Sequence, residues 1–336
     1  MIVALIAMLQ TPYDHLLEAP HPLVYSCTRG TPEINGRIDD AAWEKADWTS
    51  DFVDIEGTLK PLPRFKTRAK MLWDDEYFYI AAEMEEPHVW GTLTAHDSVI
   101  FYDNDFEVFI DPDGDNHNYF EFEINALNTG WDLRLPKPYR DGGPALNEWE
   151  QPGLKTAVHI NGTLNYSSDT DKGWAVEIAM PWSAMQGKPD LGAIQRVNFS
   201  RVEWQVEIVD GKYVKRPGLR EDNWVWTPQW VIDMHQPQMW GYVQFMDSGK
   251  PDLTDPTHRA RMALQHIYYR QKAHKEKHGS FAASLGALGC AELPGFLRPP
   301  RIYLARDGWR AGGVVDTSAG PRSLSIREDS LLRLAE

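Results

Sequence analysis

Hydrophobic and polar positions alternate along much of the first 250 residues of the chain. In residues 70–73 and 77–84, hydrophobic side chains return at every second position, and three acidic residues at positions 74–76 separate the two runs. A period of two is typical of strands with one buried face, so this segment predicts a β-hairpin with an acidic turn.

Two later runs, residues 105–111 and 118–125, carry acidic side chains on one face and hydrophobic side chains on the other. The hydrophobic face holds Phe106, Val108, Ile110, Phe120, Phe122 and Ile124, and the opposite face holds Asp105, Glu107, Phe109, Tyr119, Glu121 and Glu123. Residues 174–180, 196–204 and 240–245 are further strand candidates. Many short strands separated by Gly, Pro, Asn and Asp predict an all-β fold, a β-sandwich of the jelly-roll type.

The pattern changes after residue 250. Between residues 257 and 277, hydrophobic side chains recur at helical spacing, and Gly279 follows as a signal for the helix end. Short strand patterns come later, at residues 301–304, 313–317 and 323–327. We therefore expect an N-terminal segment over residues 1–29, the sandwich over residues 30–250, and a small helix-plus-strands appendage over residues 251–336.

The charge balance differs between these parts. The whole chain has 34 Lys and Arg against 49 Asp and Glu, a net charge of −15, whereas residues 256–336 hold 13 basic against 7 acidic residues. Nucleic-acid binding needs a basic face, so the acidic sandwich is not expected to have a nucleic-acid partner. The basic appendage is a candidate docking surface for an acidic neighbour, either the sandwich itself or a protein partner.

Three features concern the cellular compartment. No hydrophobic run approaches the roughly 18 residues that a membrane-spanning helix needs, so no membrane span is expected. Residues 1–9 are hydrophobic like the core of a signal peptide, but they lack a basic start and a clear cleavage site. Cys27 and Cys290 fit no metal-binding spacing, and they form either one long-range disulfide or two buried thiols.

The chain is rich in tryptophan, with 14 Trp beside its many carboxylates. Sugars stack their C–H faces on aromatic rings and exchange hydrogen bonds with polar side chains, so this composition favours carbohydrate binding. Aromatic rings also build cores. Trp43, Trp73, Trp174 and Trp240 stand in periodic segments and are expected in the core, whereas Trp90, Trp131, Trp149, Trp226 and Trp230 lie near loops as candidates for binding.

Five segments together resemble family 9 carbohydrate-binding modules. They are Glu33-Ile-Asn-Gly-Arg-Ile-Asp-Asp-Ala-Ala-Trp43, Met71-Leu-Trp-Asp-Asp-Glu-Tyr-Phe-Tyr-Ile80, Asp105-Phe-Glu-Val-Phe-Ile-Asp111, Gly173-Trp-Ala-Val-Glu-Ile-Ala-Met-Pro-Trp182 and Trp240-Gly-Tyr-Val-Gln-Phe245. Their order and spacing cover about residues 30–246. The resemblance implies a jelly-roll sandwich that binds polysaccharide without hydrolysing it, outside the cytoplasm, in support of polysaccharide degradation.

The resemblance also implies a sugar held between two aromatic rings. Phe101 occupies the position of the family's first ring, and Trp230 is the nearest candidate for the second. Glu107 corresponds to the strand glutamate that binds sugar hydroxyls, and Glu123 stands where the family has a basic residue. We expected Arg140, in the long loop around residues 136–141, to replace that missing cation, because its planar guanidinium suits paired hydroxyls.

Bound calcium is a further implication of the resemblance. Asp111, Asp113 and Asp115 place carboxylates at alternate positions, as calcium loops do, although the spacing is not that of an EF-hand. An ordinary acidic turn fits the same residues, so both interpretations stay open.

Two other functions remain as alternatives. Glycoside hydrolysis needs two carboxylates about 5–10 Å apart, and Glu107, Glu121, Glu123 and Glu177 are candidates on one sheet face. Some related sandwich domains bind haem, for which Met234 and His235 are the candidate ligands.

Overall fold

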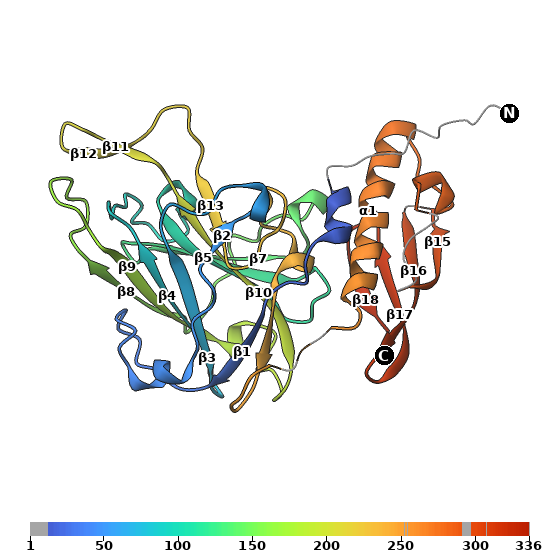
Figure 1. Ribbon diagram of the computed structural model, residues 1–336, viewed down its shortest axis with the longest axis horizontal. Coiled ribbons are helices and arrows are strands. Elements are labelled where there is room, and N and C mark those ends of the chain that lie inside the picture. The colour runs from blue at the N-terminus through green and yellow to red at the C-terminus, as the bar shows by residue number, and fades with distance from the viewer. Residues whose placement is uncertain (1–12, 252, 254, 291–296, 307, 336) are drawn as a thin grey trace.

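The computed structural model describes residues 13–251, 253, 255–290, 297–306 and 308–335. It has two parts side by side, a large β-sandwich and a smaller part built from one long helix and a four-stranded sheet (Figure 1). The hydrophobic start at residues 1–9 lies outside the described residues. None of the described helices is long and hydrophobic enough to cross a membrane.

Twelve strands form one sheet that folds into the two layers of the sandwich. They are β1 (Val24–Arg29), β2 (Val53–Asp54), β3 (Thr67–Trp73), β4 (Tyr77–Glu85), β5 (Asp105–Asp111), β6 (Tyr119–Asn125), β7 (Gly130–Leu135), β8 (Lys155–Asn161), β9 (Gly173–Pro181), β10 (Ile194–Glu203), β13 (Asp222–Val225) and β14 (Gly241–Phe245). The order is β7-β6-β5-β10-β14-β1-β3-β4-β9-β8, with β13 beside β10 and β2 beside β13. A separate hairpin of β11 (Val206–Val209) and β12 (Lys212–Lys215) extends from the sandwich (Figure 1).

Strand β1 joins the two layers. Val24 to Cys27 pair in parallel with β14 in one layer, while Thr28 and Arg29 pair in parallel with β3 in the other. The expected boundary at residue 30 is therefore wrong, because the sandwich already begins with β1.

The main core lies between the layers and confirms the period-two pattern. Phe106, Val108, Ile110, Phe120, Phe122 and Ile124 all point into this core and are at most 3% exposed. The predicted hairpin is formed by β3 and β4. The four tryptophans expected in cores, Trp43, Trp73, Trp174 and Trp240, are likewise at most 3% exposed.

A buried glutamate holds the first recognisable segment, residues 33–43, against the second layer. One carboxylate oxygen of Glu177, on β9, accepts hydrogen bonds from the backbone N–H groups of Asn35 (2.8 Å) and Gly36 (2.6 Å). Its other oxygen accepts one from the Trp43 indole at 2.6 Å. Gly36 has φ of 85°, and a Cβ there would lie 2.7 Å from the Val158 carbonyl carbon, so glycine is required.

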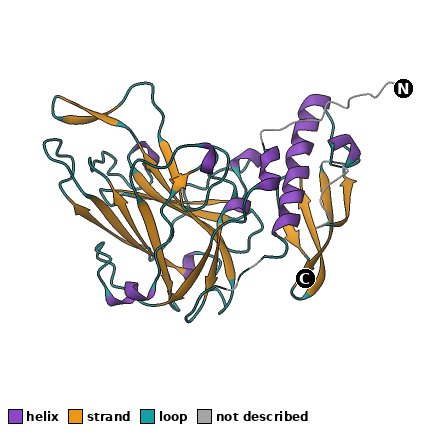
Figure 2. Ribbon diagram, in the orientation of Figure 1, coloured by secondary structure: helices purple, strands orange, loops and turns teal. Residues whose placement is uncertain are grey.

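Short 3₁₀ helices punctuate the chain and helix α1 dominates the appendage (Figure 2). The short helices are η1 (Asp14–Glu18), η2 (Ala41–Lys45), η3 (Gly57–Leu59), η4 (Ile100–Tyr102), η5 (Tyr139–Asp141), η6 (Trp182–Ala184), η7 (Pro237–Met239) and η8 (Gly286–Leu288). Helix α1 (His258–His278) ends at Gly279, whose φ of 73° is the left-handed cap expected from the sequence.

The appendage packs α1 on an antiparallel sheet with its own core. The strands are β15 (Arg298–Leu304), β16 (Trp309–Thr317), β17 (Gly320–Arg327) and β18 (Leu332–Leu334), in sequence order. Cys290 is buried in this core and Cys27 in the sandwich core, so both are free thiols and the disulfide alternative is wrong.

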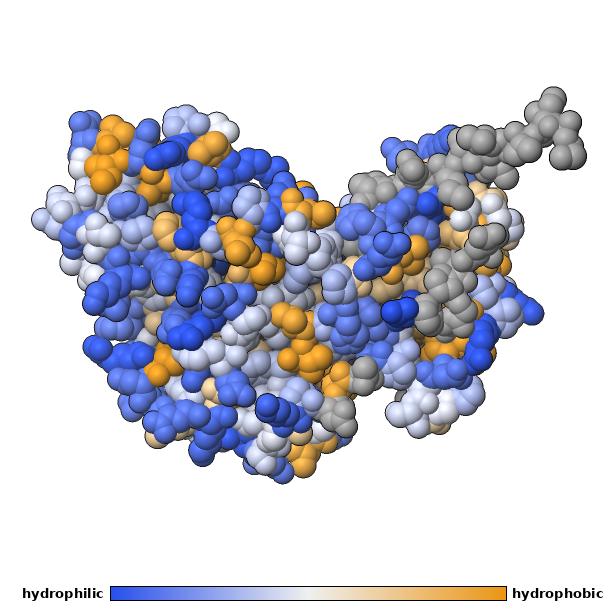
Figure 3. Space-filling view, in the orientation of Figure 1, coloured by the Kyte–Doolittle hydropathy of each residue, from blue (hydrophilic) through white to orange (hydrophobic). Residues whose placement is uncertain are grey.

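Two loops of the sandwich support the appendage. The Leu332 N–H of β18 donates to the Asp115 carbonyl at 3.0 Å, and the Tyr268 hydroxyl of α1 donates to the Asp141 carboxylate. The view in Figure 3 shows a mostly hydrophilic surface with small separate hydrophobic patches, notched where the two parts meet. The appendage therefore rests on the loops that follow β5 and β7.

Candidate functional site

Four carboxyl groups lie together on the face of β5 and β6 that points away from the main core. We call Asp105, Glu107, Glu121 and Glu123 the acidic floor. Glu107 and Glu123 are cross-strand partners in the register of β5 and β6. All four residues are at most 6% exposed because loops surround this face. Three of them, Asp105, Glu107 and Glu123, bring carboxylate oxygens within 4.8 Å of one another.

Burial and mutual repulsion favour the protonated forms of these carboxyls. Burial, with the charge of Glu221, raises the pKa of Glu107 to about 7. Burial raises the pKa values of Asp105, Glu121 and Glu123 well above their usual range, and the charge of Glu107 adds to the shift in each. Removing a carboxylate from water disfavours its charge, and like charges nearby disfavour it further. Protons are therefore shared over the floor near neutral pH.

The floor keeps unused hydrogen-bonding capacity. The Phe101 N–H donates to Glu123 Oε2 at 3.0 Å, and the Val202 N–H donates to Asp105 Oδ1 at 3.1 Å. Asp105 Oδ2 and Glu121 Oε2 are buried and have no hydrogen-bond partner among the described residues. Buried polar atoms are normally partnered, so these two oxygens are unsatisfied hydrogen-bonding groups.

Three aromatic residues stand around Glu123. Phe101, at the end of the loop before β5, donates its N–H to the Glu123 carboxylate, and Trp131 is the cross-strand partner of Glu123 on β7. Tyr139 on η5 is 46% exposed, and the nearby charges of Glu121 and Glu123, after burial, raise the pKa of its hydroxyl. The Trp131 indole N–H is buried without a partner among the described residues. We call Phe101, Trp131 and Tyr139 the ring walls.

Lys215 lies among aromatic rings next to the segment that holds Phe101 and Tyr102. Lys215 Nζ on β12 lies 3.5 Å from the ring centre of Trp204 and 5.6 Å from that of Tyr102. The Trp204 indole donates to the Phe101 carbonyl at 2.8 Å. Sequence reasoning missed Tyr139, Tyr102, Trp204 and Lys215, because the signal for each depends on contacts between distant segments.

Two of the expected binding tryptophans are buried. Trp226 is 2% exposed, packs edge-on against Tyr25 and belongs to the main core. Trp90 is 5% exposed. Trp226 packs inside the main core, so its assignment to the binding set is wrong. The Trp90 ring centre lies 5.9 Å from Lys215 Nζ, and its indole N–H is buried without a partner among the described residues, so its role in binding stays a prediction.

Trp230 lies in a different place from the ring walls. Its N–H donates to the Ile55 carbonyl at 3.0 Å, and its ring lies against Gly57. It lines a groove of about 540 Å³ with Pro22, Leu62 and other residues, and the acidic floor is not part of that lining. The structure does not pair Trp230 with Phe101 across the floor.

Arg140 serves the contact with the appendage. Its guanidinium donates to the His235 carbonyl and to Gln238 Oε1, and its charged group lies 3.8 Å from the Asp141 carboxylate. The Tyr268 ring of α1 is 5.8 Å away. The two terminal nitrogens of the guanidinium are directed at these partners, while Nε has no hydrogen-bond partner among the described residues. The expectation that Arg140 replaces the missing sugar-binding cation stays a prediction.

The candidate calcium loop joins β5 to β6. Carboxylate oxygens of Asp111, Asp113 and Asp115 lie within 4.8 Å of one another. Both Asp111 oxygens accept backbone N–H bonds at 2.9 Å, from Gly114 and Asn116. Burial raises the pKa of Asp111, and the charges of the other two carboxylates raise it further. A bound cation would relieve this repulsion, so the donor set fits calcium.

Glu177, His235 and Met234, which the two alternative functions invoke, have other neighbours, whereas Glu107, Glu121 and Glu123 belong to the acidic floor. Glu177 lies on β9 in the second layer and is occupied by the segment at residues 33–43, so it does not share a face with the acidic floor. His235 Nδ1 is 2.9 Å from the Tyr119 hydroxyl, and Met234 packs beside Trp240. His235 Nδ1 is therefore engaged with Tyr119.

Comparison with known proteins places the sandwich among carbohydrate-binding domains. The chain is 29% identical over 157 residues to Exoglucanase XynX of Acetivibrio thermocellus and 32% identical over 160 residues to Endo-1,4-beta-xylanase C of Paenibacillus barcinonensis. These matches cover 46% and 47% of the chain but 12% of each relative, so the chain spans about an eighth of their length.

Solved structures share the fold. A putative carbohydrate-binding protein from Bacteroides uniformis superposes with a TM-score of 0.50 at 14% identity, over 68% of this chain and 100% of that one. A family 9 carbohydrate-binding module from Caldicellulosiruptor kristjanssonii in complex with cellotriose gives a TM-score of 0.46 at 16% identity, over 69% and 97%. The family model described as "Carbohydrate family 9 binding domain-like" matches residues 34–247. Because these residues are more than half of the chain, the protein belongs to this family of carbohydrate-binding domains.

Proposed function

We propose that the acidic floor and the ring walls form the carbohydrate-binding site of this protein. The observation that carries the proposal is that three aromatic residues neighbour Glu123: the Phe101 backbone N–H donates to its carboxylate, Trp131 is its cross-strand partner, and its charge acts on the Tyr139 hydroxyl. The rings come from η4, β7 and η5, which are separate in the chain. A surface with rings at its edge and hydrogen-bonding groups at its base has the two features that a sugar needs.

The chemistry of the floor suits neutral hydroxyl groups. A protonated carboxyl both donates and accepts a hydrogen bond, as a sugar hydroxyl does, so the two can pair in either direction. Further hydrogen bonds to sugar hydroxyls would come from the unpartnered oxygens of Asp105 and Glu121 and from the unpartnered Trp131 N–H. A hydroxyl that reaches these atoms relieves the cost of leaving them buried and unpaired.

We propose a β-1,4-linked polysaccharide as the ligand and an extracytoplasmic location. The named relatives are an exoglucanase and xylanases, so glucan and xylan chains are the first candidates. A polymer of this kind is met outside the cytoplasm.

An affinity gel tests the function directly. The purified chain is run through gels that contain cellulose derivatives, xylan or no polysaccharide, and the same samples are assayed for reducing ends. We expect retardation in at least one polysaccharide gel with no release of reducing ends. Migration equal to that in the blank gel would contradict the proposal, and release of reducing ends would favour the hydrolase alternative.

We also propose that the loop Asp111–Asp113–Asp115 binds calcium. Oxygen ligands and a net negative charge suit this ion, and the loop contacts the appendage through the Asp115 carbonyl and through Arg261, which donates to the Gly114 carbonyl at 3.0 Å. Calcium there would stabilise the loop that links the two parts of the molecule.

Thermal unfolding with and without calcium tests this site. We expect millimolar CaCl₂ to raise the Tm of the chelator-treated protein by several degrees, because binding to the folded state alone stabilises it. Asp113→Asn should remove most of this increase. An equal calcium effect in that variant, or no effect in the parent protein, would contradict the proposal.

A further inference from the structure

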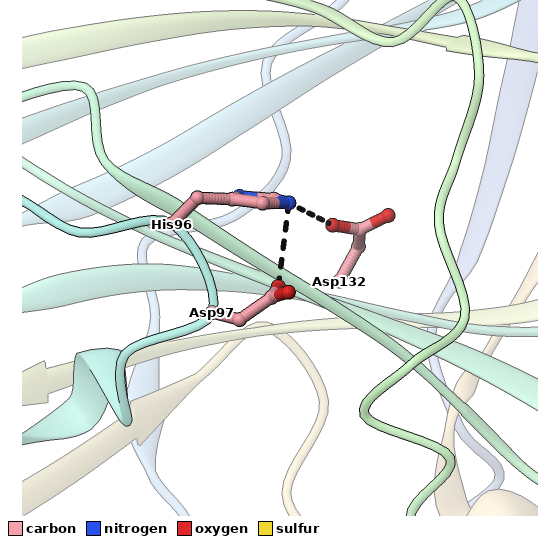
Figure 4. Close-up of side chains that lie close together, drawn as sticks. All are labelled: His96, Asp97 and Asp132. Carbon is pink, nitrogen blue, oxygen red and sulfur yellow. Dashed lines mark ion pairs between the residues drawn. The ribbon is translucent and has the colours of Figure 1, made fainter.

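His96 faces three carboxylates beside the ring walls, and two of them, those of Asp97 and Asp132, are drawn in Figure 4. His96 Nε2 lies 3.3 Å from Asp97 Oδ1, 3.4 Å from Asp132 Oδ1 and 3.3 Å from Glu150 Oε2. His96 and Asp97 belong to the loop before η4, Asp132 to β7 and Glu150 to the loop before β8. Figure 4 shows the His96 ring directed between Asp97 and Asp132.

The other ring nitrogen of His96 is already engaged. Nδ1 lies 3.0 Å from the Gly130 carbonyl, so it carries the proton and donates to that oxygen. In the neutral ring Nε2 then presents a lone pair toward the carboxylates. A histidine that donates one N–H to a backbone carbonyl and directs its other nitrogen at a cation has the arrangement of a metal ligand.

If Nε2 carries a proton, this single N–H cannot donate a good hydrogen bond to all three carboxylates at once. Only Glu150 stands in hydrogen-bonding geometry with Nε2, while Asp97 Oδ1 and Asp132 Oδ1 are buried and have no hydrogen-bond partner among the described residues. The Asp132 side chain is 2% exposed and its free oxygen points at Nε2. A buried oxygen without a partner is costly unless a ligand satisfies it.

The distances fit a small tetrahedral ion. Zinc binds imidazole nitrogen and carboxylate oxygen at about 2.0–2.2 Å, which places neighbouring ligand atoms of a tetrahedron about 3.3–3.6 Å apart. The three distances from Nε2 fall at the short end of this range. The ligand atoms of His96, Asp97 and Asp132 all lie within 4.8 Å of one another, and Glu150 stands outside this group of three. Calcium prefers oxygen ligands alone, whereas imidazole suits zinc and related transition metals.

We propose that His96, Asp97 and Asp132 bind a divalent transition-metal ion of the zinc type, and that the exposed Glu150 carboxylate, 3.3 Å from His96 Nε2, turns in as the fourth ligand. The His96 side chain is 51% and the Glu150 side chain 61% exposed, so an ion can enter from solvent. The ion fastens the loop that leads to Phe101 onto β7, which carries Trp131 next to Asp132. The ion therefore fixes the distance between Phe101 and Trp131, two of the ring walls. This effect on sugar binding rests on the proposed sugar site, but the metal binding itself does not depend on that site.

Metal titration of the intact chain tests this site. The protein is freed of metal with a chelator, the chelator is removed, and Co²⁺ and then Zn²⁺ are added while visible absorption and heat are recorded. We expect one tight site with the absorption of tetrahedral Co²⁺, displaced by Zn²⁺. Glu150→Gln, at an exposed position that leaves the fold intact, and His96→Ala should each weaken binding at least about tenfold.

The control variant is His278→Ala, which removes one member of a histidine pair on α1, His274 and His278, whose ring centres are 4.5 Å apart. It should bind the metal as the parent chain does. Absence of a Co²⁺ or Zn²⁺ site, or affinity that His96→Ala and Glu150→Gln leave unchanged, would overturn the proposal. Sugar affinity is measured separately with and without Zn²⁺, so failure of the sugar site does not obscure the metal result.

Discussion

Glu107 lies on the outer face of β5, where burial and the acidic neighbours raise its pKa to about 7. Its carboxyl faces Glu121 and Glu123 of β6, Asp105 of its own strand and the charge of Glu221. In an unfolded chain a glutamate titrates near pH 4.3. Between about pH 4.3 and pH 7, the folded protein therefore keeps a proton on Glu107 that the unfolded chain has released.

This shift predicts a loss of stability as the pH rises. Because the raised pKa belongs to the folded state, its contribution is fully present below about pH 4.3 and is lost as the pH passes through 7. We expect Glu107→Gln to raise the Tm at pH 8 by at least about 2 °C and to change it little at pH 5. Scanning fluorimetry from pH 5 to 8 measures this, with Glu207→Gln on the exposed β11 as control. Parallel curves for the parent and Glu107→Gln would contradict the prediction.

Single residues also mark the limit of sequence reasoning here. Period-two alternation placed Glu107 and Glu123 on one face, and the structure confirms that face. Trp226 could not be assigned in this way, because β13 before it is four residues long and shows no readable alternation. The role of Arg140 depends on α1, more than a hundred residues later in the chain.

At the scale of elements, Glu177 on β9 holds residues 33–43, which form no strand, against the second layer of the sandwich. Its carboxylate accepts three hydrogen bonds, from Asn35, Gly36 and the Trp43 indole, in a place where the glutamate is fully buried. The resemblance of residues 33–43 to the family thus has a physical basis, since the glycine turn and the tryptophan both serve this carboxylate. The sequence showed the motif and the strand, but their contact depends on the packed sandwich.

Removal of this carboxylate is expected to destabilise the sandwich strongly. Glu177→Ala leaves three donors without their acceptor, and we expect a loss of about 3 kcal/mol or more in the free energy of unfolding. Glu177→Gln keeps one acceptor oxygen and should lose less. Urea unfolding followed by tryptophan fluorescence measures both. A loss below about 1 kcal/mol for Glu177→Ala would show that these hydrogen bonds are not important for stability.

At the scale of the whole molecule, the appendage supports the loops around the proposed sugar site. Tyr268 of α1 donates to Asp141, and Lys272 Nζ donates to the Arg140 carbonyl at 2.5 Å. Both partners follow Tyr139 in η5, so α1 holds one of the ring walls in place. The sequence predicted the sandwich, the helix and the tail strands. Their mutual placement was not predictable, because hydrogen bonds between the two parts leave no pattern within either.

The most direct test of the sugar site is a calorimetric titration of Tyr139→Ala with the polysaccharide fragment that the gel assay selects. Tyr139 is exposed, so its removal should leave the fold intact, and Tyr166→Ala is a matched control because Tyr166 is also exposed. We expect Tyr139→Ala to weaken binding about tenfold, or about 1.4 kcal/mol, and Tyr166→Ala to bind as the parent protein does. Equal affinity in Tyr139→Ala and the parent would contradict the assignment of the site to the acidic floor and its ring walls.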